Sequence, residues 1–168
     1  GITTKTNKYV PEERIKDFEE FVSPYHSDLI WNLVDKTEKI NYIASWETNR
    51  GCPFSCTFCD WGSAVNTKVR NLPEEKLYKD IEWFGKNKIK YVEICDGNFG
   101  IFRERDYKIS EKLSDVKADT GFPEKVNLTW VKASSERILP IARKLSENEL
   151  LRAVSLSVQS FDKNALDI

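Results

Sequence analysis

The chain has 168 residues, of which 40% are hydrophobic and 32% charged, and its formal net charge is -1 at pH 7. That length suffices for one domain with a hydrophobic core. The near-neutral charge excludes an electrostatic reason to bind nucleic acid or an anionic membrane. Because no apolar run could span a bilayer and the N-terminus does not resemble a signal peptide, we expect a protein of the reducing cytoplasm, where clustered cysteines bind metals.

The first 40 residues differ in pattern from the rest, which predicts a lead-in segment over residues 1–40 and a core over 41–168. Pro11 can open a short helix, Ser23-Pro24-Tyr25 breaks it, and residues 28–34 are apolar enough for a second. The chain contains no methionine, begins at Gly1 and ends on a run typical of a helix that has just begun. We therefore expect an internal fragment of a longer protein.

From residue 41 onward, strand and helix patterns alternate. Residues 42–46 are apolar and aromatic, which predicts a buried strand. A helix then begins at Pro73, buries the stripe Leu77, Ile81 and Phe84, and ends over residues 85–88. Residues 91–95 are the second predicted strand, closed by residues 96–98.

Two further strand and helix pairs follow. Ile109, Leu113 and Val116 mark the buried face of a helix that stops near Gly121, and residues 126–131 form a strand. Ser134 or Ser135 can cap the next helix, in which Pro140 either causes a kink or sets a start one residue before it. Residues 153–158 form the fourth strand, and Asp162 can cap a fourth helix.

Four such alternations predict an α/β fold of parallel βαβ units. Periodicity alone leaves an open sheet and a barrel as alternatives. In both, ligands bind at the carboxyl ends of the strands, and the segment that follows the first strand therefore lies at the binding edge.

That segment holds three of the four cysteines, Cys52, Cys56 and Cys59, in the spacing C-x3-C-x2-C. Thiolates are the usual ligands of iron–sulfur clusters, and a cubane cluster takes four, so three ligands leave one iron open to a small molecule. A zinc site needs a fourth ligand, and neither Cys95 nor His26, the only remaining thiol and the only histidine, has a usual finger spacing. The count therefore favours a catalytic cluster.

With Phe58 before the third cysteine, the stretch resembles the C-x3-C-x-aromatic-C signature of the radical S-adenosylmethionine (SAM) superfamily. The resemblance implies that Cys52, Cys56 and Cys59 hold a [4Fe-4S] cluster, that SAM chelates the open iron, and that Phe58 lies near the adenine. It also implies a partial (β/α)6 TIM-like barrel, of which this chain supplies the first four βα units. The Ser23-Pro24-Tyr25 segment is similar to the linker of the cobalamin-binding subgroup.

The segment after the second strand occupies the position at which this family binds the SAM ammonium group. Asp96, or the backbone around Gly97, is the implied acceptor, and the alternative is that Asp-Gly simply forms a turn. We expect Cys95 to be a buried strand residue rather than a fourth ligand.

Residues 155–161 are similar to the fourth-strand segment of several radical SAM enzymes, which makes Ser157 and Gln159 candidates for contacts with the SAM ribose or the substrate. Ser157 departs from the glycine usual there. The alternation of polar and aliphatic residues also fits an exposed edge strand.

The sequence thus predicts a radical SAM enzyme that reductively cleaves SAM to a 5′-deoxyadenosyl radical, with cobalamin-dependent methyl transfer as the leading subtype. A small-molecule substrate and an electron donor such as ferredoxin or flavodoxin are the expected partners. The alternatives are a non-catalytic iron–sulfur electron-transfer module and a zinc-stabilised binding domain. No residue is assigned as catalytic.

Overall fold

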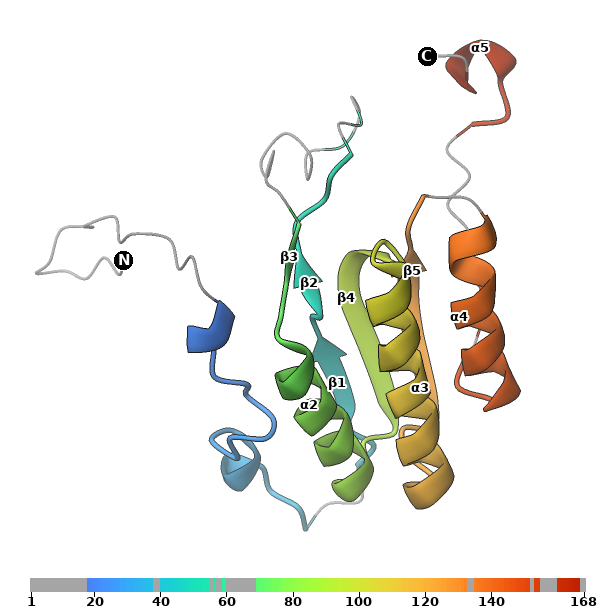
Figure 1. Ribbon diagram of the computed structural model, residues 1–168. Coiled ribbons are helices and arrows are strands. Elements are labelled where there is room, and N and C mark those ends of the chain that lie inside the picture. Colours follow the sequence, from blue (N-terminus) through green and yellow to red (C-terminus); the bar gives the residue numbers. More distant parts are fainter. Residues whose placement is uncertain are drawn as a thin grey trace, which may run out of the picture.

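Three parallel strands form the sheet at the centre of the fold (Figure 1). The computed structural model describes residues 18–37, 40–54, 56, 59, 69–132, 135–151, 153–154 and 160–166. β1 (Ile43–Trp46), β4 (Tyr91–Phe99) and β5 (Lys125–Trp130) lie in the order β1-β4-β5, with β4 in the middle. Further along the chain, Leu151 forms a parallel bridge with Val126. This parallel arrangement confirms the predicted α/β class.

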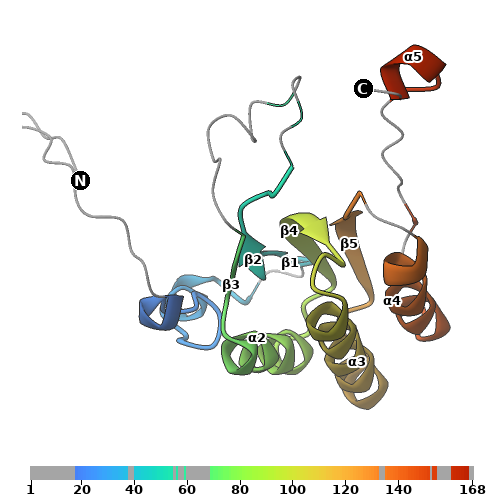
Figure 2. The ribbon, with the colours of Figure 1, turned by 45° about the horizontal axis from the view of Figure 1, so that its top comes forward.

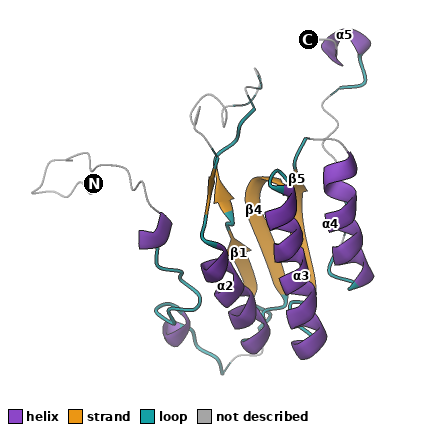
Figure 3. Ribbon diagram, in the orientation of Figure 1, coloured by secondary structure: helices purple, strands orange, loops and turns teal. Residues whose placement is uncertain are grey.

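The helices that connect the strands lie together as a layer, with α2 (Glu74–Lys86) and α3 (Arg103–Thr120) on one face of the sheet and α4 (Ser135–Glu147) beside α3 (Figures 2 and 3). α3 ends as predicted at Gly121, whose φ of 80° is the left-handed conformation that favours glycine. α4 runs through Pro140, so the alternative start just before that proline is wrong. A short helix, α5 (Lys163–Leu166), begins just after Asp162.

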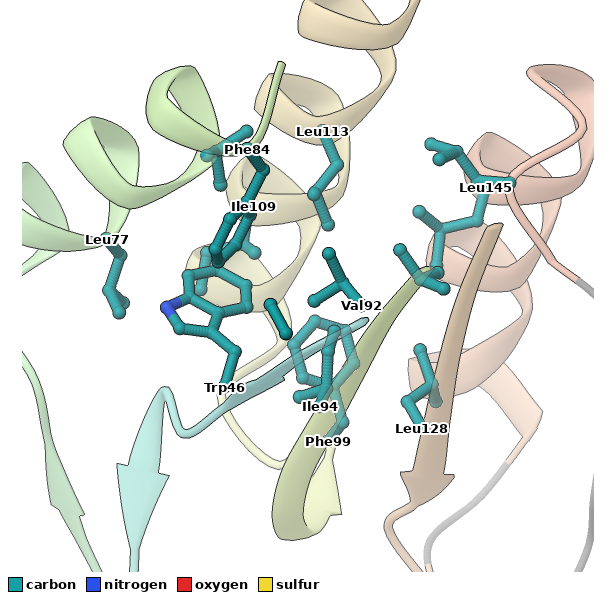
Figure 4. Packing of buried hydrophobic residues seen from close by; sticks show 14 of the residues in the cluster. Trp46, Leu77, Phe84, Val92, Ile94, Phe99, Ile109, Leu113, Leu128 and Leu145 are labelled. Carbon is teal, nitrogen blue, oxygen red and sulfur yellow. The ribbon is translucent and has the colours of Figure 1, made fainter. Parts of the chain in front are cut away.

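The hydrophobic core lies between the sheet and the helices (Figure 4). Alternate residues of β4 point toward the helices, and Val92 and Ile94 are each 1% exposed. The predicted helical stripes are confirmed, since every one of their residues is buried: Leu77, Ile81, Phe84, Ile109, Leu113 and Val116. Amphipathic helices covering one face of a parallel sheet thus account for the packing.

The opposite face of the sheet carries a polar row that crosses all three strands. Ser45, Glu93 and Asn127 are register partners on β1, β4 and β5. Asn127 Nδ2 donates to both carboxylate oxygens of Glu93, at 3.0 and 2.8 Å. Because side chains alternate along a strand, this row points away from the three helices.

Residues 18–37 of the lead-in pack against α2 and β1. The Tyr25 ring contacts the rings of Phe84 and Trp83, with centroids 5.0 and 5.4 Å apart. Buried Asp80 of α2 accepts hydrogen bonds from Ser23 and Trp46 and contacts His26 Nδ1 at 2.9 Å.

Helical structure in this segment is limited to two 3-10 turns, η1 (Phe18–Glu20) and η2 (Trp31–Leu33). The helix expected over residues 28–34 is therefore reduced to one turn. The start of the helix expected at Pro11 lies outside the described residues, and before Ser23 the described part contains only the turn η1. In the part of the chain that the structure describes, no helix has both the length and the apolar character needed to cross a membrane.

Candidate functional site

The chain enters the cysteine segment, residues 51–69, at the carboxyl edge of the sheet, as predicted, between two short strands that the sequence did not reveal (Figure 1). β2 (Asn49–Arg50) pairs antiparallel with β3 (Arg70–Asn71), and Leu72 N donates to Thr48 O at 3.0 Å. This ribbon closes the base of the segment that carries all three clustered cysteines. Two-residue polar strands have no periodicity, so only the three-dimensional contact could identify them.

Buried Asp96 anchors the start of this ribbon to β4. Its Oδ1 accepts from the backbone N–H groups of Thr48 and Asn49, at 2.6 and 3.1 Å. Its Oδ2 accepts from Asn49 Nδ2 at 2.7 Å and from the Thr48 hydroxyl. Burial raises the pKa of Asp96 to about 6, against the opposing effect of the hydrogen bonds from Thr48 and Asn49. Four hydrogen bonds to one carboxylate thus fix the direction in which the chain enters the cysteine segment.

Arg105, on the first turn of α3, provides a second anchor. Its Nη1 donates to Thr48 Oγ1 at 3.2 Å, and its Nη2 donates to Thr48 O. The guanidinium is held by Asp106, whose Oδ1 lies 2.6 Å from Arg105 Nη1. Asp106 Oδ2 in turn accepts from the backbone N–H groups of Gly100 and Phe102, at 2.8 and 3.1 Å. The network therefore joins the base of the cysteine segment to the loop after β4.

The carboxyl end of β4 is longer and less regular than predicted. Residues 96–98 belong to the strand, which continues to Phe99, so the expectation that they close it and the alternative of a simple turn are both wrong. Ile94 pairs with Leu128 and Phe99 with Trp130, so the residues between Ile94 and Phe99 outnumber their partners and form a bulge. This bulge carries two buried polar residues, Asp96 and Asn98.

Cys52, Cys56 and Cys59 are partly exposed, and two of their sulfurs accept hydrogen bonds. Asn98 Nδ2 donates to Cys52 Sγ at 3.2 Å, and Lys132 Nζ donates to Cys56 Sγ at 3.5 Å. Cysteine sulfurs are the ligands that an iron–sulfur cluster requires, so the three cysteines fit such a cluster by their chemistry.

The structure does not bring the three sulfurs together into a complete ligand set. Among the described residues, no group of three or more histidine, cysteine, aspartate or glutamate side chains is positioned to hold a metal ion. Cys95 is exposed on β4, so the expectation that it is buried is wrong. It lies on the strand face opposite to Asp96, because neighbouring side chains alternate.

The remaining predicted site residues divide into two groups. Asp96 and Gly97 lie in the bulge of β4, at the carboxyl edge of the sheet. Phe58, Ser157 and Gln159 lie outside the described residues. Sequence analysis missed Thr48, Arg105, Asn98 and Lys132, because no motif or periodicity distinguishes a polar residue that will contact a distant loop.

Comparison with known proteins agrees with the sequence motif and the parallel fold. The model of the radical SAM superfamily matches residues 46–168. The chain therefore belongs to the radical SAM superfamily, a superfamily of enzymes, which confirms the resemblance and the class of fold expected from the sequence. Membership of this superfamily implies two cofactors, a [4Fe-4S] cluster and SAM.

Two curated relatives are similar over much of this chain. The 2-(S-pantetheinyl)-carbapenam-3-carboxylate methyltransferase of Streptantibioticus cattleyicolor is 38% identical over 94% of this chain and 23% of its own length. The cobalamin-dependent radical SAM methyltransferase TokK of Streptomyces tokunonensis is 40% identical over 76% of this chain and 19% of its own length. The chain thus spans about a fifth of the length of these relatives.

A solved structure shows a weaker likeness. The radical SAM methyltransferase TsrM from Kitasatospora setae, with cobalamin and a [4Fe-4S] cluster bound, is 15% identical and has a TM-score of 0.43. The match covers 65% of this chain and 28% of TsrM. At that TM-score the likeness carries no weight for fold or function.

Proposed function

We propose that the protein is a radical SAM enzyme whose [4Fe-4S] cluster is held by Cys52, Cys56 and Cys59. One observation carries the proposal: the C-x3-C-x2-C segment is anchored at the carboxyl edge of a parallel sheet, in a chain that belongs to this superfamily. Parallel α/β folds bind their ligands at that edge. When bound, the cluster supplies the electron that cleaves SAM to a 5′-deoxyadenosyl radical.

The protein's own residues bind and orient the cofactor. Both carboxylate oxygens of Asp96 are already engaged by Thr48 and Asn49, so the backbone around Gly97 is the better available acceptor for the SAM ammonium group. We assign Phe58 to a contact with the adenine of SAM. We assign Ser157 and Gln159 to contacts with the ribose of SAM or with the substrate.

The proposed reaction is methyl transfer to a small molecule with the help of cobalamin. The names of the two relatives support this subtype, since both are methyltransferases and one is cobalamin-dependent. In this proposal a low-potential donor such as ferredoxin or flavodoxin supplies the electrons, and the protein works in the reducing cytoplasm. The polar row of Ser45, Glu93 and Asn127 offers hydrogen-bonding groups to a ligand on the open face of the sheet.

The test is anaerobic reconstitution of the full-length protein with iron and sulfide, followed by addition of SAM and a reductant. We expect a brown protein with the iron content of one [4Fe-4S] cluster that converts SAM to 5′-deoxyadenosine, and that also forms S-adenosylhomocysteine when cobalamin is present. A brown protein that leaves SAM intact would indicate an electron-transfer module. A colourless protein containing zinc would indicate a zinc-stabilised domain.

The cysteine assignment has a matched control within the chain. Cys56→Ala should abolish cluster retention, because two cysteine ligands cannot hold the cubane stably. Cys95→Ala removes an exposed thiol outside the motif and should retain the iron content of the wild type. Iron analysis and the visible absorbance of the two variants check this, and normal SAM cleavage by Cys56→Ala would refute the assignment.

A further inference from the structure

Two side chains outside the cysteine motif donate N–H groups to its sulfurs, and they come from different strands. Asn98 lies in the bulge of β4, and its Nδ2 is 3.2 Å from Cys52 Sγ. Lys132 follows the end of β5, and its Nζ is 3.5 Å from Cys56 Sγ. The carboxyl ends of neighbouring parallel strands thus converge on two different cysteines.

The two donors differ in their surroundings. Asn98 is 4% exposed, and a buried amide needs a partner for its N–H groups, so the bond to Cys52 satisfies a group that would otherwise be unpaired. The bulge is what turns Asn98 toward the cysteine segment, since the regular register with β5 is lost between Ile94 and Phe99. Lys132 is exposed and brings a full positive charge.

We infer that Asn98 and Lys132 are positioning residues that raise the reduction potential of the cluster. The inference rests on the proposed function, because it assigns a role toward the cluster held by the cysteines. Reduction adds one negative charge, which spreads onto the sulfurs. An N–H donor and a nearby cation both stabilise that charge, and hydrogen bonds to the sulfurs are among the factors that set cluster potentials. A higher reduction potential makes it easier for a biological donor to transfer an electron to the cluster.

The test is an EPR-monitored redox titration of the reconstituted full-length protein without SAM. Asn98→Leu removes the donor at similar size, and Lys132→Met removes the charge at similar length. Each should shift the midpoint potential to a more negative value. Asn98→Gln and Lys132→Arg keep an N–H donor. Their midpoint potentials should therefore lie between that of the wild type and that of the corresponding variant without a donor.

Lys125→Met is the control for the loss of one lysine, because Lys125 lies at the opposite end of β5 and bonds to Glu149 O. It should leave the midpoint unchanged. Unchanged potentials in Asn98→Leu and Lys132→Met, with wild-type iron content, would overturn the inference while leaving the proposed function intact. If the wild type itself bound no cluster, the proposed function would fail first.

A second measurement uses the wild-type fold alone, so it remains decisive if a variant loses its cluster. Protein labelled with 15N-asparagine or 15N-lysine is reconstituted and reduced, and its HYSCORE spectrum is recorded. We expect a 15N coupling to the cluster with each label, because an N–H···S bond carries spin density to the donor nitrogen. The absence of both couplings would overturn the inference.

Discussion

Asp96 is the residue on which the entry to the cysteine segment depends most. It is 2% exposed, and its carboxylate accepts four hydrogen bonds from Thr48 and Asn49. A buried acid with this many partners links the local stability of the site to pH. The carboxyl end of a parallel strand is also where the family's SAM-binding segment was expected, so one residue combines a structural contact with the position of a binding site.

The pKa of Asp96, raised by burial to about 6 from 3.8, has a definite consequence for stability. The folded protein binds this proton more tightly than the unfolded chain. The resulting stabilisation is complete below pH 3.8 and is lost as the pH rises through about 6. Asp96→Asn cannot titrate. The unfolding free energy of the wild-type apoprotein should therefore fall, relative to the variant, by about 2 kcal/mol between about pH 4 and about pH 7. Urea denaturation across this range measures it, and parallel pH profiles would contradict it.

At the scale of elements, the contact between α2 and α3 depends on the absence of a side chain at Gly85. A Cβ there would lie 2.5 Å from Val116 Cγ1 and 2.9 Å from Thr120 Oγ1. Gly85→Ala should thus lower the free energy of unfolding by about 1–3 kcal/mol, although alanine is the better helix former by about 1 kcal/mol. Thermal or urea denaturation measures the change.

Two further variants test that explanation. Adding Val116→Ala to Gly85→Ala should recover part of the loss, since it removes the atom that the new Cβ would meet. Lys79→Ala, at an exposed position of the same helix, should change stability by no more than about 0.5 kcal/mol. Equal stability of Gly85→Ala and Lys79→Ala would show that the two helices are not packed as described.

The elements with a buried periodic face were predictable, and those without one were not. Leu77, Ile81 and Phe84 located α2 because a helix that covers a sheet must repeat its apolar residues every three or four positions. β2 and β3 were missed because two polar residues cannot show a period. β4 was predicted too short because Asp96 and Asn98 are polar, and their burial depends on partners that lie far away in the sequence.

The candidate site shows the same division. The spacing of Cys52, Cys56 and Cys59 predicted the family correctly, because a motif confined to one short segment can be recognised from local sequence alone. Arg105 contacts Thr48, at the base of that segment, across 57 residues, and Lys132 contacts Cys56 across 76 residues. Nothing in the neighbourhood of either residue signals its partner, and only the folded sheet brings them together. The division into a lead-in and a core remains a prediction.

At the scale of the whole molecule, one edge of the sheet gathers the functional groups. β1, β4 and β5 are parallel, so the cysteine segment, the β4 bulge and Lys132 meet where these strands end. The lead-in packs beside this assembly through Tyr25 and Asp80. The proposed function places a cluster with three protein ligands at this edge, which would leave one coordination position for SAM.

Mössbauer spectroscopy of the 57Fe-reconstituted full-length protein, recorded with and without SAM, tests that position most directly. The account predicts one [4Fe-4S] cluster in which a single iron changes its isomer shift and quadrupole splitting when SAM is added, while the other three do not. Four irons that are unaffected by SAM would contradict it, because all four would then be bound by the protein.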